Sequence, residues 1–301
     1  MTRHLLEITD LSAAELELVL DLSEMPDPPQ VLAGQGAMLL FEKPSARTRT
    51  SMELAVMQLG GHPVTLRNEE VGIDTRESSE DLARLFSGYG SIIAARVFEH
   101  SKLERLAAAA SVPVINLLTD ESHPIQILAD LLTIRAEFGQ LHDLTIAWVG
   151  DGNNVARSMA LGAMLVGANF RIAHPDGYGF SAKTSADLAK AGCVPFIARD
   201  PQTAAGGADV VVTDAWYSMG QETEAVVRRR DFAHHRVTEQ VMAVAASHAI
   251  FLHCLPAHRG EEATDAVLDG PQSRIWPEAQ NRMHSARGLL GFLLGDHGSE
   301  P

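Results

Sequence analysis

The sequence contains few cysteines, few aromatic residues and no long apolar run. Its 301 residues include two cysteines, Cys193 and Cys254, which argues against a disulfide framework and against a zinc site built from thiolates. No segment approaches about 18 consecutive apolar residues, so no membrane span is expected, and residues 1–10 mix charged and apolar side chains unlike a signal peptide. These absences favour a protein of the reducing cytoplasm.

Basic side chains are also scarce. The chain has 24 lysines and arginines against 39 acidic residues, which gives a formal net charge of −15. Such a field repels phosphate polymers and anionic membranes, so neither nucleic acid nor a membrane is an expected partner. A small phosphorylated ligand remains compatible with this charge, because a few arginines at a helix N-terminus create a locally positive pocket.

Apolar residues make up 46% of the chain and fall into short runs with helical patterns between them. The length favours two domains. Runs of strand length occupy residues 37–41, 91–97, 112–116, 144–149, 169–173, 209–213 and 249–252. Their alternation with helices predicts an α/β protein with parallel sheets flanked by helices.

Three helices are strongly indicated. An apolar stripe at i, i+3, i+4 and i+7 begins at Met52, and Gly60 follows where a helix C-cap is expected. A second helix runs from Pro124 to Phe138 and stops at Gly139, and the last spans about Pro277 to Leu294. We place the domain boundary at Gly139.

The segment from Phe41 to Thr50 carries the clearest chemical signal. It lies between an apolar strand and an amphipathic helix, and it places Arg47 and Arg49 in the first helical turn. The helix dipole disfavours cations there unless an anion compensates them, and Ser45 and Thr48 can donate to such an anion. The segment therefore predicts a phosphate-binding helix N-terminus. The alternative is that Ser45 or Thr48 only caps the helix.

Nucleotide and metal motifs are missing. No G-x-x-x-x-G-K-[ST] run occurs, residues 150–154 lack the third glycine of a dinucleotide fingerprint, and the 13 histidines form no H-E-x-x-H pattern. No metal or organic cofactor is therefore expected, and a nicotinamide-dependent oxidoreductase is an outside alternative.

Other polar residues lie at the ends of predicted strands or the starts of predicted helices. Arg96 lies near the end of one strand, and His123 and Gln126 lie one turn apart at a helix start. Asp214 and His253 each directly follow an apolar run. Ligands of open α/β sheets bind at such strand ends, although each residue alone is more often a cap, a turn or a core residue.

Four segments together resemble the ornithine carbamoyltransferases of the aspartate/ornithine carbamoyltransferase family. They are Ser45-Ala-Arg-Thr-Arg49, His123-Pro-Ile-Gln126, Asp214-Ala-Trp-Tyr-Ser-Met-Gly220 and His253-Cys-Leu-Pro256, in the family's order across nearly the whole chain. The aspartate branch lacks the Ser-Met-Gly loop, so the resemblance points to ornithine as the acceptor. It implies transfer of the carbamoyl group of carbamoyl phosphate to L-ornithine, giving L-citrulline and phosphate in arginine metabolism, without a cofactor.

The resemblance implies roles in each half of the chain. Carbamoyl phosphate would be bound by Ser45, Ala46 through its backbone N–H, Arg47, Thr48, Arg96, His123 and Gln126. Ornithine would be bound by Asn154, Asp214, Ser218, Met219, Cys254 and Leu255. The residues that act in catalysis would be Arg96, His123, Asp214, Cys254 and Arg282.

The family's fold consists of two doubly wound parallel-sheet domains joined by two helices. The resemblance implies a carbamoyl phosphate-binding domain at residues 1–138 and an ornithine-binding domain at residues 139–282. A C-terminal helix at about residues 283–301 would pack back on the first domain. The family assembles as trimers, so a homotrimer or a multiple of trimers is expected.

Two features depart from the family's pattern. Ala46 stands where threonine is usual, so one hydroxyl to the phosphate is lost. Glu70, in the acidic loop 68–79, falls roughly where relatives place a residue that reaches a neighbouring subunit's phosphate, and a carboxylate there opposes phosphate. The alternatives are therefore a relative that carbamoylates another amine, such as putrescine or an acylated ornithine, and a non-catalytic homologue.

Overall fold

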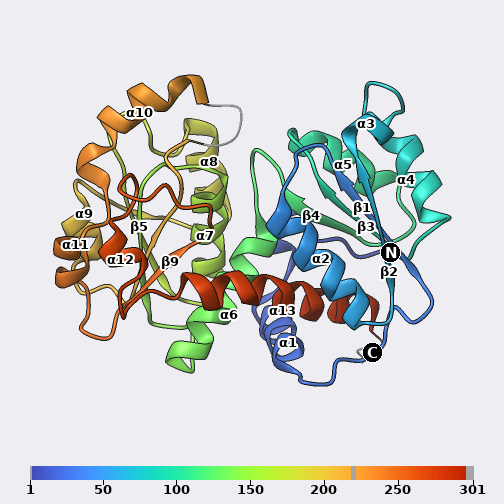
Figure 1. Ribbon diagram of the computed structural model, residues 1–301, viewed down its shortest axis with the longest axis horizontal. Coiled ribbons are helices and arrows are strands. Elements are labelled where there is room, and N and C mark those ends of the chain that lie inside the picture. Colours follow the sequence, from blue (N-terminus) through green and yellow to red (C-terminus); the bar gives the residue numbers. More distant parts are fainter. Residues whose placement is uncertain (1, 218–221, 296–301) are drawn as a thin grey trace. The chain divides into compact units, whose positions relative to one another are not determined.

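The computed structural model describes residues 2–217 and 222–295, and the chain divides into two compact units (Figure 1). Unit 1 consists of residues 1–132 and 280–301, and unit 2 of residues 133–279. The chain passes between the units inside two helices, α6 (Pro124–Phe138) and α13 (Ile275–Leu294). The predicted fold class, two α/β domains with parallel sheets, is confirmed.

Unit 1 is built around a four-stranded parallel sheet. The strand order is β2 (His62–Arg67), β1 (Gly36–Phe41), β3 (Ile92–Arg96) and β4 (Val114–Leu118). Every residue of the inner strand β3 is buried, as expected where helices cover both faces of a parallel sheet. Its helices are η1 (Ile8–Asp10), α1 (Ala13–Glu24), α2 (Ala46–Gln58), α3 (Asn68–Val71), α4 (Ser79–Ser87) and α5 (His100–Ala109), with the ends of α6 and α13.

Unit 2 is built around a five-stranded parallel sheet. The order is β7 (Phe196–Ala198), β6 (Asn169–Ala173), β5 (Thr145–Val149), β8 (Val210–Thr213) and β9 (Ile250–His253). The central strand β5 is buried throughout. The helices are α7 (Asn154–Leu165), α8 (Ala182–Lys190), α9 (Pro201–Ala205), η2 (Glu222–Glu224), α10 (Ala225–Asp231), η3 (Ala233–His235), α11 (Glu239–Val244) and α12 (Asp265–Leu268).

The two strands that the sequence did not predict, β2 and β7, both lie at a sheet edge. β2 is half-exposed and contains Pro63, and β7 has only three residues, of which Phe196 and Ile197 are exposed. The other two edge strands, β4 and β9, are buried and contain apolar runs, whereas β2 and β7 are partly exposed and need no such run, so their sequence signal is weak.

Each sheet has one position where the strand order reverses. In unit 1 the reversal lies between β1 and β3, and in unit 2 between β5 and β8. Adjacent loops leave these strand ends toward opposite faces of the sheet, which opens a crevice for ligands. The loops after these four strands contain the segments around Ser45, Arg96, Asn153 and Asp214.

The last helix of the chain packs on unit 1, beside α1 and α2 (Figure 1). The contact is closest at Gly288, where an added Cβ would meet Ser23 Oγ at 2.1 Å and the backbone oxygen of Val19 at 2.4 Å. Arg287 beside it donates to the backbone oxygens of Ser23 and Met25, both at 2.8 Å. The α1–α13 contact therefore requires glycine at residue 288.

We predict that Gly288→Ala lowers the free energy of unfolding by about 3 kcal/mol, because the methyl group cannot fit without moving backbone. Gly291→Ala is the matched control on the same helix, since its nearest neighbour would be Leu22 Cδ1 at an ordinary 3.9 Å. That control should raise stability by up to ~1 kcal/mol through helix propensity. Urea denaturation measures both variants, and equal stabilities would contradict the close contact.

Candidate active site

The helix N-terminus that the sequence predicts as a phosphate site is present in unit 1. Ser45 is the N-cap of α2, and its Oγ accepts from the backbone N–H of Thr48 at 3.3 Å and donates to Thr48 Oγ1 at 3.1 Å. Ala46 and Arg47 in the same turn are exposed, whereas Thr48 is buried. Ser45 therefore does cap the helix, while the dipole and the remaining N–H groups still favour an anion beside it.

The side chain of Thr48 also contacts two arginines. Its Oγ1 accepts from Arg282 Nη2 at 2.9 Å and, more weakly, from Arg96 Nη1 at 3.5 Å. Arg282 Nη1 also donates to Gln126 Oε1, and Gln126 Nε2 donates to Asp130 Oδ1 at 2.7 Å. These contacts join the first turn of α2, the end of β3, the start of α6 and α13.

The charges in this cluster favour a bound anion. Arg96 is 7% exposed and Arg282 is 5% exposed, and buried guanidinium groups are costly unless anions compensate them. His123 is also buried, and burial, followed by the positive charges of Arg282, Arg96 and Arg47, holds its pKa well below the ordinary histidine value. A neutral imidazole still donates one N–H, so it can bind a carbonyl oxygen without adding charge.

In unit 2, Asp214 is the hub of a second group. It follows β8, and its Oδ1 accepts from Cys254 Sγ at 3.0 Å and from the backbone N–H of Ala215 at 2.7 Å. Its Oδ2 accepts from Asn153 Nδ2 at 2.9 Å. The structure thus places Asp214 and Cys254, two predicted site residues 40 positions apart, in direct contact.

Asn153, which the sequence analysis did not name, also belongs to the group around Asp214. The sequence analysis named Asn154, the first residue of α7, and the hydrogen bond to Asp214 comes from its neighbour Asn153. Asn153 is the N-cap of α7, and its Oδ1 accepts from the backbone N–H groups of Val155 and Ala156. The signal was available, because asparagine before a helix is a preferred cap.

Glu262 is a second residue next to this group that the sequence analysis did not name. It is fully buried, and its Oε1 lies 3.0 Å from Nε2 of His253, which is also fully buried. His253 Nδ1 accepts from the backbone N–H of Leu255 at 2.9 Å, so the proton of a neutral ring is on Nε2. Leu255 has left-handed backbone with φ 58°, a conformation that is uncommon for a bulky residue. The His253–Glu262 pair therefore supports the backbone that follows Cys254.

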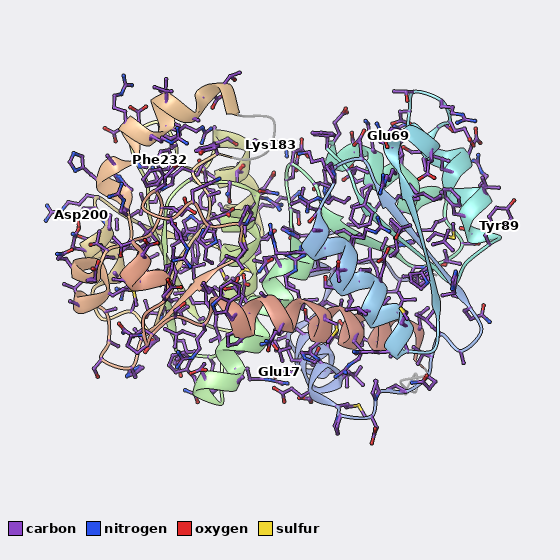
Figure 2. All side chains as sticks on the ribbon, in the orientation of Figure 1. Glu17, Glu69, Tyr89, Lys183, Asp200 and Phe232 are labelled. Carbon is purple, nitrogen blue, oxygen red and sulfur yellow. The ribbon has the colours of Figure 1, made fainter. Side chains whose placement is uncertain are left out.

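The loop after β8 is anchored by aromatic packing and by one arginine. Trp216 packs against Phe232, which is fully buried and labelled in Figure 2, with 5.6 Å between ring centroids. Arg228 Nη1 donates to the backbone oxygen of Trp216 at 2.8 Å and to Asp151 Oδ2 at 2.7 Å. Ser218 and Met219, which the sequence reasoning placed at ornithine, lie outside the described residues.

Comparison with known proteins identifies this arrangement. The profile for the carbamoyl-P binding domain of aspartate/ornithine carbamoyltransferases matches residues 3–136, and the profile for their Asp/Orn binding domain matches residues 142–293. This chain belongs to the aspartate/ornithine carbamoyltransferase family. The family that the four sequence motifs indicated is therefore confirmed.

Similar proteins match this family member over nearly their whole length. The ornithine carbamoyltransferase of Haloquadratum walsbyi is 44% identical and that of Nostoc punctiforme 45% identical, with 98% and 97% of both chains covered. Among solved structures, the Pyrococcus furiosus ornithine carbamoyltransferase has a TM-score of 0.92 at 39% identity, covering 98% of each chain. An N-acetyl-L-ornithine transcarbamylase has a TM-score of 0.83 at 30% identity, covering 96% of this chain and 99% of its own.

Within the described part of this carbamoyltransferase, two groups of side chains have atoms spaced for a metal ion. They are Asp214, His253 and Cys254, and His258, Glu261 and Glu262. In the first group both ring nitrogens of His253 already have partners, and Cys254 already donates to Asp214. A metal there would have to replace these contacts.

Among the described residues, no helix has the length and apolar character needed to cross a membrane.

The two cysteines differ in accessibility, and we predict that iodoacetamide labels Cys254 well before Cys193. Cys254 is half-buried, whereas Cys193 is buried and burial raises its pKa to about 11, which leaves little thiolate. Mass spectrometry of peptides after labelling at about pH 8 measures the two rates. Unfolding the chain in urea should equalise them, and equal rates in the folded chain would contradict the prediction.

Proposed function

We propose that this chain transfers the carbamoyl group of carbamoyl phosphate to the side-chain amine of L-ornithine, giving L-citrulline and phosphate. The observation that carries the proposal is the contact of Cys254 Sγ with Asp214 Oδ1 at 3.0 Å. It joins the two second-half motifs by which the chain resembles the ornithine branch. Relatives 44–45% identical over nearly the whole chain bear the name ornithine carbamoyltransferase, which supports the same acceptor.

In this proposal the cluster of unit 1 binds carbamoyl phosphate. The backbone N–H groups at the start of α2, with Ser45, Arg47 and Thr48, hold the phosphate. Arg96, His123, Gln126 and Arg282 surround the carbamoyl group, and the buried guanidinium groups donate to its oxygen and to the phosphate. Neutral His123 donates to the carbamoyl oxygen.

The group around Asp214 in unit 2 binds ornithine. An aliphatic amine with a pKa of about 10.4 is mostly protonated near neutral pH and cannot attack in that state. The carboxylate of Asp214 and the thiol of Cys254 orient the amine after it has lost a proton. Asn153 holds the carboxylate from its other oxygen.

In the reaction, the neutral nitrogen forms a bond to the carbamoyl carbon. The carbonyl oxygen gains negative charge, which Arg96, His123 and Arg282 stabilise, and preorganised donors of this kind supply a large share of catalysis. The carbon–oxygen bond to phosphate then breaks, phosphate leaves with the electron pair, and the nitrogen gives its second proton to the departing phosphate, which leaves as hydrogen phosphate. Positioning and charge account for the reaction without a cofactor.

A panel of acceptor amines tests the proposal. The purified chain is given carbamoyl phosphate with L-ornithine, putrescine, N-acetyl-L-ornithine or L-aspartate, and kcat/KM is measured for each. We expect kcat/KM for L-ornithine to exceed that for every other amine by at least about 10²-fold. An analogue that lacks a group of the true acceptor leaves polar groups of the site without their hydrogen-bond partners and is rejected. A preference for N-acetyl-L-ornithine or putrescine would reassign the acceptor, and turnover of none would indicate a non-catalytic homologue.

The assembly and compartment are further parts of the proposal. We propose a homotrimer or a multiple of trimers in the cytoplasm. The half-exposed edge strand β2 and the exposed Leu54 and Met57 on α2 offer an apolar surface for a second copy, and two isolated cysteines suit a reducing compartment. Light scattering after gel filtration should give three times the chain mass or a multiple of it, and a monomer would contradict this.

A further inference from the structure

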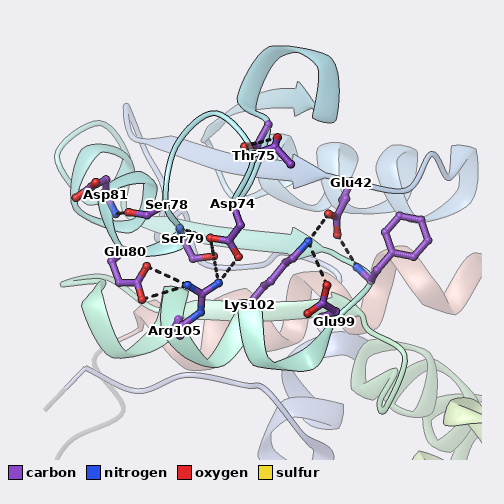
Figure 3. A network of polar contacts seen from close by, with 12 residues as sticks. Glu42, Asp74, Thr75, Ser78, Ser79, Glu80, Asp81, Glu99, Lys102 and Arg105 are labelled. Atoms are coloured by element: carbon purple, nitrogen blue, oxygen red, sulfur yellow. Dashed lines mark hydrogen bonds and ion pairs between the residues drawn. The ribbon is translucent and has the colours of Figure 1, made fainter.

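A nearly buried ion pair lies directly before the phosphate-binding segment. Glu42 follows β1, its side chain is 9% exposed, and its Oε1 lies 2.8 Å from Lys102 Nζ (Figure 3). Its Oε2 accepts from the backbone N–H of Phe98 at 2.7 Å. Lys102 comes from α5, is 13% exposed, and also lies 3.6 Å from Glu99. Both oxygens of Glu42 are thus engaged.

The same residue joins two segments of the proposed carbamoyl phosphate site. Glu42 lies three residues before Ser45, the cap of α2, and its backbone N–H donates to the backbone oxygen of Arg96 at 2.9 Å. Its side chain holds Phe98, two residues after Arg96. Glu42 therefore fixes the end of β1 to the loop after β3 at two points.

The charge of Glu42 matters as much as its position. A carboxylate beside a site for a phosphate dianion opposes binding unless a cation neutralises it. Lys102 supplies this cation, because the hydrogen bond to Glu42 raises its pKa although burial alone would lower it. Lys43 also interacts electrostatically with Glu42, but its Nζ packs over the ring of Phe98, 4.0 Å from the ring centroid, and among the described residues Lys102 forms the ion pair with Glu42.

We propose that Lys102 is a positioning residue for carbamoyl phosphate. Through Glu42 it holds the Ser45–Thr48 turn in register with Arg96, and it cancels a negative charge next to the phosphate. The role rests on the proposed function, since it concerns the same site.

Lys102→Gln and Lys102→Met test the proposal, with Lys102→Arg as the conservative variant. The matched control is Arg105→Met, one turn further along α5, because Arg105 pairs with Asp74 and Glu80 (Figure 3) and, among the described residues, forms no hydrogen bond or ion pair with the phosphate-binding segment. For each variant the KM of carbamoyl phosphate, the KM of L-ornithine and kcat are measured. Calorimetry with inorganic phosphate gives the affinity of the phosphate site without any acceptor.

We expect Lys102→Gln and Lys102→Met to raise the KM of carbamoyl phosphate and the Kd of phosphate about tenfold, while the KM of L-ornithine stays within about twofold. Lys102→Arg should restore most of the affinity, and Arg105→Met should leave both constants unchanged. Glu42→Gln combined with Lys102→Gln should recover part of the loss, because no charge is then left uncompensated. Thermal melting confirms that each variant is folded.

The proposal is overturned if Lys102→Gln leaves the Kd of phosphate unchanged. It is also overturned if Arg105→Met raises the Kd of phosphate as much as Lys102→Gln does, or if Lys102→Gln raises the KM of L-ornithine by the same factor. A general loss of stability would then explain the effect. Failure of the proposed function appears separately, as a wild-type chain that forms no citrulline, and the phosphate calorimetry remains decisive in that case.

Discussion

Replacing Arg282 by methionine is expected to lower kcat roughly 10²- to 10³-fold, the usual effect of removing one donor to a developing oxyanion. Arg282 is nearly buried and donates to Thr48 and Gln126, so no solvent ion can readily take its place. Methionine has a similar length and keeps the packing of the helix. Steady-state assays of citrulline formation at saturating substrates measure the effect.

Arg287→Met is the matched control for this variant. Arg287 lies on the same helix, is 7% exposed, and donates to the backbone oxygens of Ser23 and Met25 in unit 1. Losing it leaves the buried backbone oxygen of Ser23 and the partly buried one of Met25 without this donor, so the free energy of unfolding should fall by about 1–3 kcal/mol. The kcat of the folded chain should stay within about twofold. If both variants lost activity equally, Arg282 would have only a structural role.

Asp214→Asn is the second substitution with a large expected effect. It keeps the shape of the side chain but removes the charge, so the acceptor for Cys254 weakens and the amine loses its anionic partner. We expect kcat/KM for L-ornithine to fall roughly 10²- to 10⁴-fold, the range seen for groups that manage a reacting proton. The KM of carbamoyl phosphate should stay within about twofold, because it is bound by other residues.

Asp209→Asn controls for the loss of an acidic residue next to the same strand. Asp209 precedes β8, at the end away from Asp214, and accepts from the backbone N–H of Thr145 and from His248, each at 2.8 Å. The Asp209→Asn substitution should change kcat/KM for L-ornithine less than about twofold while slightly lowering the free energy of unfolding. Unchanged kinetics in Asp214→Asn would contradict the proposed ornithine site.

The inner strands were predictable because burial on both faces gives them a nearly continuous apolar run, broken only by Arg96 at the end of β3 and Thr145 at the start of β5. The edge strands β2 and β7 were not, since exposure removes the apolar run on which such a prediction depends. The unit boundary falls within α6, where helical periodicity continues without a break and the sequence offers no stop before Gly139.

The site residues divide in the same way. Ser45 and Asp214 could be located from their positions after apolar strands, but Arg282 was named only through the family resemblance. Its partners Thr48 and Gln126 are 234 and 156 residues away, and no local pattern in α13 marks it. Glu262 was missed because its contact to His253 depends on a loop whose backbone conformation the sequence does not reveal.

Glu70, one of the two residues that depart from the family's pattern, has a local structural role. Its carboxylate accepts from the backbone N–H of Arg67 at 2.8 Å, within a capping arrangement at the start of α3. Capping the first turn of a helix is a favourable use of a carboxylate. Whether Glu70 also affects phosphate binding stays a prediction, and the calorimetry with inorganic phosphate described above can be applied to Glu70→Gln.

The most direct test of carbamoyl transfer follows the carbon itself. The purified chain is mixed with carbamoyl phosphate labelled with carbon-13 and with L-ornithine, and NMR records the labelled carbon while phosphate release is measured in parallel. The proposed function predicts that the label appears in the ureido group of L-citrulline, with one phosphate released for each citrulline, and that Asp214→Asn slows both equally. Label that appears only in cyanate or bicarbonate, the products of spontaneous decomposition, would contradict it.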